Sequence, residues 1–196
     1  MNTDLTDMTA EQCKQRLKEL IIEKALRFGD FTLASGEKSN YYMDCRPVTL
    51  SSEGAYCLGR CLVEELRDDG VDALGGMVVG AVPIAAATSA VAASLGVKLD
   101  AFCVRKEPKD HGTGQQVEGP LAEGARVAMV EDTVTTGGST LRAIEALKRE
   151  RNVEIVTVVV MVDRQEGAAE AFAEAGYNFR SLFTVADLGV STGAQE

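Results

Sequence analysis

The sequence has few basic residues and lacks a long apolar segment. Its 196 residues include 20 lysines and arginines against 30 aspartates and glutamates, which gives a net charge of −10. Because nucleic acids and membrane surfaces are themselves anionic, this balance argues against both as partners. The apolar stretch 155–162 is far shorter than a bilayer requires, and no secretory signal opens the sequence. We expect a cytoplasmic protein, in which a local basic cluster can still bind an anionic substrate.

The sequence also lacks the spacing of a zinc site or a disulfide framework. It contains a single histidine and no CxxC pair, and its cysteines are widely spread: Cys13, Cys45, Cys57, Cys61 and Cys103. We interpret them as small buried hydrophobes in a reducing compartment, with a disulfide or zinc site as the alternative.

The N-terminal quarter predicts a helix followed by a hairpin. Thr9 and Gln12 have capping-box spacing, and apolar residues then recur at helical intervals until Gly29 supplies a stop. Strands are expected at 31–34 and 41–45, and a second helix at 51–66. We expect a hood over residues 1–50 on a single domain spanning 1–196.

From residue 73 onward, short apolar runs alternate with helical patterns. Apolar strands separated by helices indicate a parallel sheet covered on both faces, that is, a doubly wound α/β fold. The polar, aperiodic segment 105–124 interrupts this order and predicts a flexible lid loop. The expected strands are 73–79, 99–104, 126–130 and 154–162, and the expected helices are 84–95, 139–151 and 168–175.

The segment VEDTVTTGGST, residues 130–140, joins a predicted buried strand to a predicted helix. Ligands of open α/β sheets bind at this edge, and glycines with free N–H groups at a helix N-terminus suit a phosphate. The adjacent carboxylates of Glu131 and Asp132 would repel that phosphate, so they suit ribose hydroxyls or a Mg²⁺ ion brought by the substrate. TTGGS alone would fit a helix that is merely capped. The glycine turn together with the acidic pair and the preceding strand indicates a ribose-phosphate site. Neither a Walker loop nor a dinucleotide fingerprint is present.

The whole motif resembles the phosphoribosyl diphosphate signature of the type I phosphoribosyltransferases. The resemblance implies that the loop grips the 5-phosphate while the carboxylates contact the ribose hydroxyls. The diphosphate-binding residues implied in this motif are Glu131, Asp132, Thr133, Val134, Thr135, Thr136, Gly137, Gly138 and Ser139.

Two further segments resemble the orotate phosphoribosyltransferase family. These are FTLASGEKSNYYMD at 31–44 and VDRQEG at 162–167. The resemblance implies transfer of a 5-phosphoribosyl group to orotate in pyrimidine biosynthesis, with Thr135 and Arg164 binding orotate. A guanidinium can pair bidentately with the orotate carboxylate, which purine bases lack. A surface ion pair of Arg164 with Asp163 or Glu166 is the structural alternative.

A basic cluster begins the predicted lid, where RKEPKDHG at 105–112 resembles the family's RKxxKxHG segment. Mobile cations can close over a diphosphate and stabilise it as it leaves, although a lone histidine is often just a solvated loop residue. The resemblance implies that Arg105, Lys106, Lys109 and His111 bind the diphosphate, and that a homodimer shares the lid between subunits. We predict catalytic roles for Lys106, Lys109, His111 and Asp132, with Mg²⁺ held mainly by the substrate rather than by protein ligands.

The sequence departs from many members of the family at two places. Ala34 stands where they carry a lysine, and Val79-Gly80 stands where they carry a Tyr-Lys pair. Whether Lys38 or Arg46 replaces the missing charge stays open, and Gly80 can still offer a backbone N–H. The alternatives to an orotate enzyme are a purine or uracil salvage phosphoribosyltransferase and a non-catalytic regulator with this fold.

Overall fold

The N-terminal segment folds as a capped helix that leads directly into a strand. In the computed structural model, which describes residues 4–32, 38–108 and 115–191, a 3₁₀ turn (η1, Leu5–Asp7) precedes α1 (Ala10–Leu20). Thr9 and Gln12 form the predicted capping box. The expected helix end at Gly29 is wrong, because a π-helical turn (η2, Ile21–Ala25) passes into β1 (Leu26–Thr32). Leu26 pairs across the hairpin with Met43, and this tertiary pairing overrides the local helical pattern.

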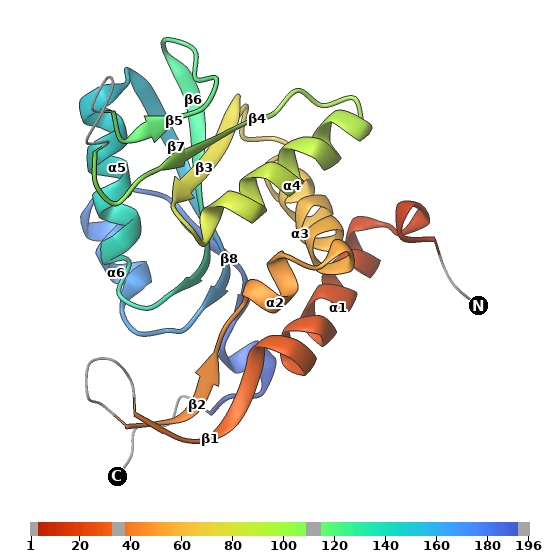
Figure 1. Ribbon diagram of the computed structural model, residues 1–196. Coiled ribbons are helices and arrows are strands. Elements are labelled where there is room, and N and C mark those ends of the chain that lie inside the picture. Colours follow the sequence, from red (N-terminus) through yellow and green to blue (C-terminus); the bar gives the residue numbers. More distant parts are fainter. Residues whose placement is uncertain (1–3, 33–37, 109–114, 192–196) are drawn as a thin grey trace.

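The hairpin is longer than the sequence pattern predicted. β1 pairs antiparallel with β2 (Lys38–Met43), and their register shifts between Phe28 and Phe31, around Gly29. Part of the expected strand 31–34 falls outside the described residues. A short helix α2 (Arg46–Thr49), with Pro47 near its start, leads to α3 (Ser52–Glu65), which Ser51 caps and which matches the expected helix 51–66. Figure 1 shows the hairpin below the body of the molecule, reached through α1 and α2.

The central sheet has six strands in the order β5-β4-β3-β6-β7-β8, and all neighbours are parallel except β5 and β4. This confirms the doubly wound parallel sheet. Two strands were not predicted: β5 is a two-residue antiparallel edge inside the expected lid, and β8 is half polar. The strands are β3 (Ala73–Met77), β4 (Asp100–Val104), β5 (Val117–Glu118), β6 (Ala125–Val134), β7 (Val153–Asp163) and β8 (Phe179–Thr184).

Helices cover both faces of the sheet (Figure 1). α1, α3 and α4 (Ala81–Ser94) pack on one face, and α5 (Gly138–Glu150) and α6 (Ala168–Glu174) pack on the other. Alternation along β6 serves the two cores, since Val130 packs with α3 and α4 while Met129 packs with α5. A final 3₁₀ turn, η3 (Ala186–Leu188), follows β8. Among the described residues, no helix is both long and apolar enough to cross a membrane.

Candidate active site

The turn between β6 and α5 leaves the N-terminus of that helix open. β6 continues beyond the expected 126–130 to Val134, so Thr135 to Gly137 form the connection. No side chain caps α5, and its first turn contains no acidic residue. Gly137 has φ +79°, and a Cβ there would lie 3.0 Å from Phe172 Cζ, so both conformation and space require glycine. Free N–H groups at a helix N-terminus attract an anion.

Glu131 and Asp132 lie in the last part of β6, and neither carboxyl group forms an ion pair within the described structure. Glu131 is buried, with 8% of its surface exposed, and no lysine or arginine of the described residues lies within ion-pair distance of either carboxyl group. Burial, together with the neighbouring Asp132 charge, raises the pKa of Glu131 to about 8. Burial also raises the pKa of Asp132, against the hydrogen bond that its Oδ1 accepts from the Thr133 N–H at 2.8 Å. The pair is therefore short of external hydrogen-bond donors.

Gly80 brings the backbone directly against this acidic pair. It precedes α4, and the Val78–Val79 peptide bond just before it is cis. A Cβ on Gly80 would lie 2.4 Å from Glu131 Oε1 and 2.9 Å from Asp132 Oδ1. Any larger residue at position 80 would therefore require the ends of these two side chains to shift. The N-terminus of α4 lies beside the two carboxyl groups.

Arg164 follows β7 and is held by the N-terminal hairpin. The register pairs Val134 of β6 with Asp163 of β7, so Thr135 and Arg164 follow neighbouring strand ends. The Arg164 Nε donates to the Tyr41 hydroxyl at 2.9 Å, and its guanidinium lies 4.9 Å from the centre of the Tyr41 ring. It also pairs with Glu166 at 2.9 Å, one of the two ion pairs considered as the structural alternative, although the Arg164 side chain is largely buried. Sequence reasoning missed Tyr41, although the YY of the hairpin motif was a signal for it.

Of the two candidates for the missing charge, Arg46 lies within electrostatic reach of Asp132. Its guanidinium pairs with Asp44 at 2.8 Å, and the Asp132 charge contributes to raising its pKa. Cys45, between them, is buried, and burial with the charges of Asp132 and Asp44 raises its thiol pKa. The start of α2 thus adjoins the acidic pair.

The start of the predicted lid lies across a cavity from α5. Lys106, Ser139 and Arg142 line this cavity of about 390 Å³. Arg105 points elsewhere and pairs with Glu118 of β5 at 3.1 Å. Lys109 and His111 lie outside the described residues. Sequence reasoning also missed Arg142, whose Nη1 lies 3.5 Å from where a Cβ of Gly138 would stand, above the glycine turn.

The donor set has limited capacity for a metal ion. In the described ranges, no group of three or more histidine, cysteine, aspartate or glutamate side chains is arranged to hold one. Two carboxyl groups stand together at residues 131 and 132, and carboxylate oxygen is a ligand that Mg²⁺ accepts. The residues therefore fit a Mg²⁺ ion that takes most of its ligands from a substrate and water.

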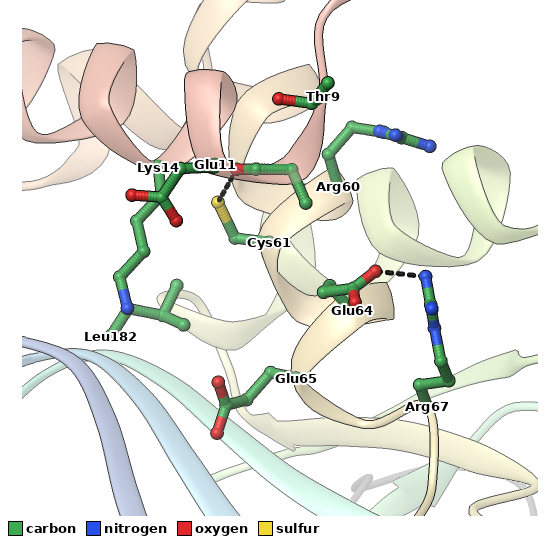
Figure 2. Close-up of a pocket in the computed structure, with 10 residues that line it drawn as sticks. Thr9, Glu11, Lys14, Arg60, Cys61, Glu64, Glu65, Arg67 and Leu182 are labelled. Carbon is green, nitrogen blue, oxygen red and sulfur yellow. Dashed lines mark hydrogen bonds and ion pairs between the residues drawn. The ribbon is translucent and has the colours of Figure 1, made fainter.

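A second cavity, of about 530 Å³, lies away from the sheet edge, between α1 and α3 and beside Leu182 of β8 (Figure 2). Two of its polar groups have partners within the lining: Glu64 pairs with Arg67, and the Cys61 thiol faces the Ala10 carbonyl oxygen at 3.9 Å. It has no glycine turn or open helix N-terminus and is separate from the candidate site.

The model of the phosphoribosyl transferase domain family matches residues 58–175. A curated orotate phosphoribosyltransferase from Rhodopirellula baltica is 44% identical over 192 residues, covering 93% of this chain and 99% of its own. The crystal structure of Mycobacterium tuberculosis orotate phosphoribosyltransferase in complex with Fe(III) dicitrate has a TM-score of 0.81 and 39% identity, over 91% of this chain and 99% of its own. The same enzyme in complex with 5-phospho-alpha-D-ribosyl 1-diphosphate gives a TM-score of 0.77 and 36% identity, with the same coverage.

The match to the family model shows that the protein is a phosphoribosyltransferase. The identity to the curated relatives over nearly the whole chain shows which kind: the chain belongs to the orotate phosphoribosyltransferase family, the pentosyltransferases that serve pyrimidine biosynthesis. Neither alternative from the sequence, a salvage enzyme or a non-catalytic regulator, finds support in these comparisons.

Proposed function

We propose that the sheet edge at the ends of β6 and β7 is where this enzyme joins its two substrates. The reaction breaks the bond between the ribose anomeric carbon and the diphosphate oxygen and forms a bond from that carbon to N1 of orotate. The products are orotidine 5′-monophosphate and diphosphate, which keeps the electron pair of the broken bond and takes up the proton lost from N1. The observation that carries the proposal is the uncapped N-terminus of α5 directly after a buried acidic pair.

Each part of the edge has a distinct task in this proposal. The amides and hydroxyls of residues 135–139 hold the 5-phosphate, while Glu131 and Asp132 accept hydrogen bonds from the ribose hydroxyls. The ionised pair also stabilises the cationic character that develops at the anomeric carbon, and Glu131, whose pKa is about 8 in the free enzyme, contributes once it has lost its proton. Lys106, on the cavity wall opposite α5, stabilises the departing diphosphate. We keep the same role for Lys109 and His111, and a diphosphate contact for Arg105, as predictions from the sequence.

Mg²⁺ enters this proposal as part of the diphosphate substrate. When bound it would neutralise phosphate charge on the departing group, and Glu131 and Asp132 of β6 would be the protein carboxyl groups that face it on the ribose side. Removing it with EDTA should abolish turnover, and adding Mg²⁺ in excess should restore it.

The direct test of the function is orotate-dependent release of diphosphate in the presence of Mg²⁺. We expect turnover with orotate and none with adenine, hypoxanthine or uracil. Turnover with one of those bases and not with orotate would overturn the assignment.

Orotate selection is tested at Arg164. Arg164→Ala should raise the KM for orotate by roughly tenfold or more, because a charge-assisted pair is lost, while the KM for phosphoribosyl diphosphate stays unchanged. Arg67→Ala is a suitable control, because Arg67 pairs with Glu64 at an exposed position. An equal loss for both substrates would assign Arg164 a structural role.

We also propose that the active unit is a homodimer with the lid shared between subunits. Two inactive variants, Lys109→Ala and Asp132→Asn, should partly restore activity when their subunits are exchanged in a mixture. Absence of complementation in a mixture proven to exchange would count against a shared site. A cytoplasmic location stays a prediction, supported by five free thiols.

A further inference from the structure

Gln116 is a buried polar residue at the point where the predicted lid returns to the sheet. It is 7% exposed and immediately precedes β5. The side-chain Nε2 of Gln116 donates to the backbone carbonyl oxygens of Arg105 at 3.0 Å and Lys106 at 3.2 Å. The backbone carbonyl oxygen of Gln116 accepts from the Arg105 N–H at 2.9 Å. One residue therefore fixes the backbone of the two cations that begin the lid.

The C-terminal end of α5 holds Gln116 in turn. The Glu150 carboxylate accepts from the Gln116 N–H at 2.9 and 3.0 Å and from the Val117 N–H at 3.0 Å. The Arg149 guanidinium donates to Gln116 Oε1. All hydrogen-bonding groups of Gln116 thus have a partner, and a fully satisfied buried network is rigid.

This network bears on the site through Lys106. Lys106 and Gln116 line the same cavity as Ser139, the last residue of the segment 135–139 proposed to hold the 5-phosphate. The Lys106 charge partly opposes the rise in the pKa of Glu131. The ammonium group of Lys106 therefore lies within electrostatic reach of the acidic pair. Loss of the Gln116 amide would leave two carbonyl groups without their donor and free the Lys106 backbone to move.

We infer that Gln116 is a positioning residue for this reaction, which holds Lys106 at the edge of the diphosphate site while Glu150 and Arg149 tie it to α5. Gln116 itself touches no substrate in this arrangement. The inference rests on the proposed role of Lys106 in stabilising the departing diphosphate.

The test compares Gln116→Leu with Gln115→Leu in the full-length enzyme. Gln115 is a matched control, because it is only partly buried and its Oε1 has one long contact, 3.4 Å from Arg151 Nη2. We expect Gln116→Leu to lower kcat/KM for phosphoribosyl diphosphate by roughly tenfold with the KM for orotate unchanged, and Gln115→Leu to leave both within about twofold. Equal effects of the two variants would overturn the inference.

A double-mutant cycle separates positioning from general destabilisation. In a Lys106→Ala background, Gln116→Leu should cost less than about twofold, because the residue it positions is gone and the effects are not additive. A further tenfold loss in that background would overturn the inference while leaving the role of Lys106 intact. If Lys106→Ala alone has no effect, the proposed role of Lys106 fails, and the inference fails with it.

Gln116→Glu keeps the cycle informative if the leucine variant does not fold. The carboxylate preserves the size of the side chain and its contact with Arg149 but removes both donors toward the carbonyl groups. The same non-additive loss of about tenfold supports the inference, and wild-type kinetics overturn it.

Discussion

The acidic and basic halves of the site differ in how they are held before substrate binds. Glu131 and Asp132 are largely withdrawn from water and have no cationic partner among the described residues. Two arginines at the same edge are paired: Arg46 with Asp44, and Arg164 with Glu166. The acidic half has unmet hydrogen-bonding capacity, whereas the basic half has partners it can exchange.

This difference assigns separate tasks to the two substrates. In the proposed reaction, ribose hydroxyls would supply donors to carboxyl groups that are already desolvated, so little reorganisation would be needed there. The orotate carboxylate would instead compete with Glu166 for Arg164, in an exchange of similar partners that contributes selection more than affinity. Four predictions test this comparison.

The largest effect is expected when the acidic half loses its charge. The double variant Glu131→Gln/Asp132→Asn should lower kcat/KM for phosphoribosyl diphosphate by about 10²- to 10³-fold, because amides stabilise developing positive charge poorly. Steady-state assays with saturating orotate measure it. Glu154→Gln, at the other end of the neighbouring strand, is the control. A change below about threefold would remove the pair from the mechanism.

A methyl group at Gly80 should displace the acidic pair without changing its charge. Gly80→Ala places a Cβ 2.4 Å from Glu131 Oε1, so the end of this flexible side chain must move, and we expect kcat/KM to fall by roughly tenfold. Gly96→Ala, with φ +74° and no atom within 4 Å, should destabilise the fold with kcat unchanged. If both variants keep full activity, the close approach at Gly80 has no catalytic importance.

The buried pair should also make stability depend on pH. Because the folded-state pKa of Glu131 is raised, its favourable contribution is present below its unfolded value and is lost as pH rises through about 8. Glu131→Gln should therefore be more stable than wild type at pH 9 by a few kcal/mol, and this advantage should vanish toward pH 5. Urea unfolding of the free enzyme between these values measures it. A difference in unfolding free energy that does not change with pH would show that it does not arise from the titration of Glu131.

The smallest effect is expected in the basic half. Glu166→Gln removes the carboxylate that would compete with orotate for Arg164, and because the Glu166 side chain is 42% exposed, solvent screens this ion pair. The KM for orotate should fall by about two- to threefold, with the KM for phosphoribosyl diphosphate unchanged. A rise in the orotate KM would show that Glu166 orients Arg164 instead of competing for it.

The parts of the fold that could be predicted from the sequence are those with local causes. The Thr9 capping box and the alternation of apolar strands with helices depend on residues close in the chain. β1 replaced the expected end of the helix because its partner strand lies more than ten residues further on. β8 and β5 were missed because one is half polar and the other is two residues long.

The candidate site divides in the same way. The glycine turn and the acidic pair are contiguous, so their motif predicted them together. Tyr41 and Arg164 are 123 residues apart, and Gln116 reaches Glu150 over 34 residues, so no local pattern joins either pair. The approach of Gly80 to Glu131 likewise depends on β3 and β6 being neighbours in the sheet.

Phe172 of α6 supports the Gly137 turn, the proposed 5-phosphate site, from the interior of the protein. Its ring lies beneath Gly137, is fully buried, and stacks on Phe179 with ring centres 5.0 Å apart. Phe172 of α6, backed by Phe179 of β8, therefore packs against the turn that would receive the 5-phosphate and restricts its backbone conformation. In a mutational survey of this enzyme, a smaller side chain at Phe172 would register as weaker phosphoribosyl diphosphate binding, although no atom of that residue would touch the ligand.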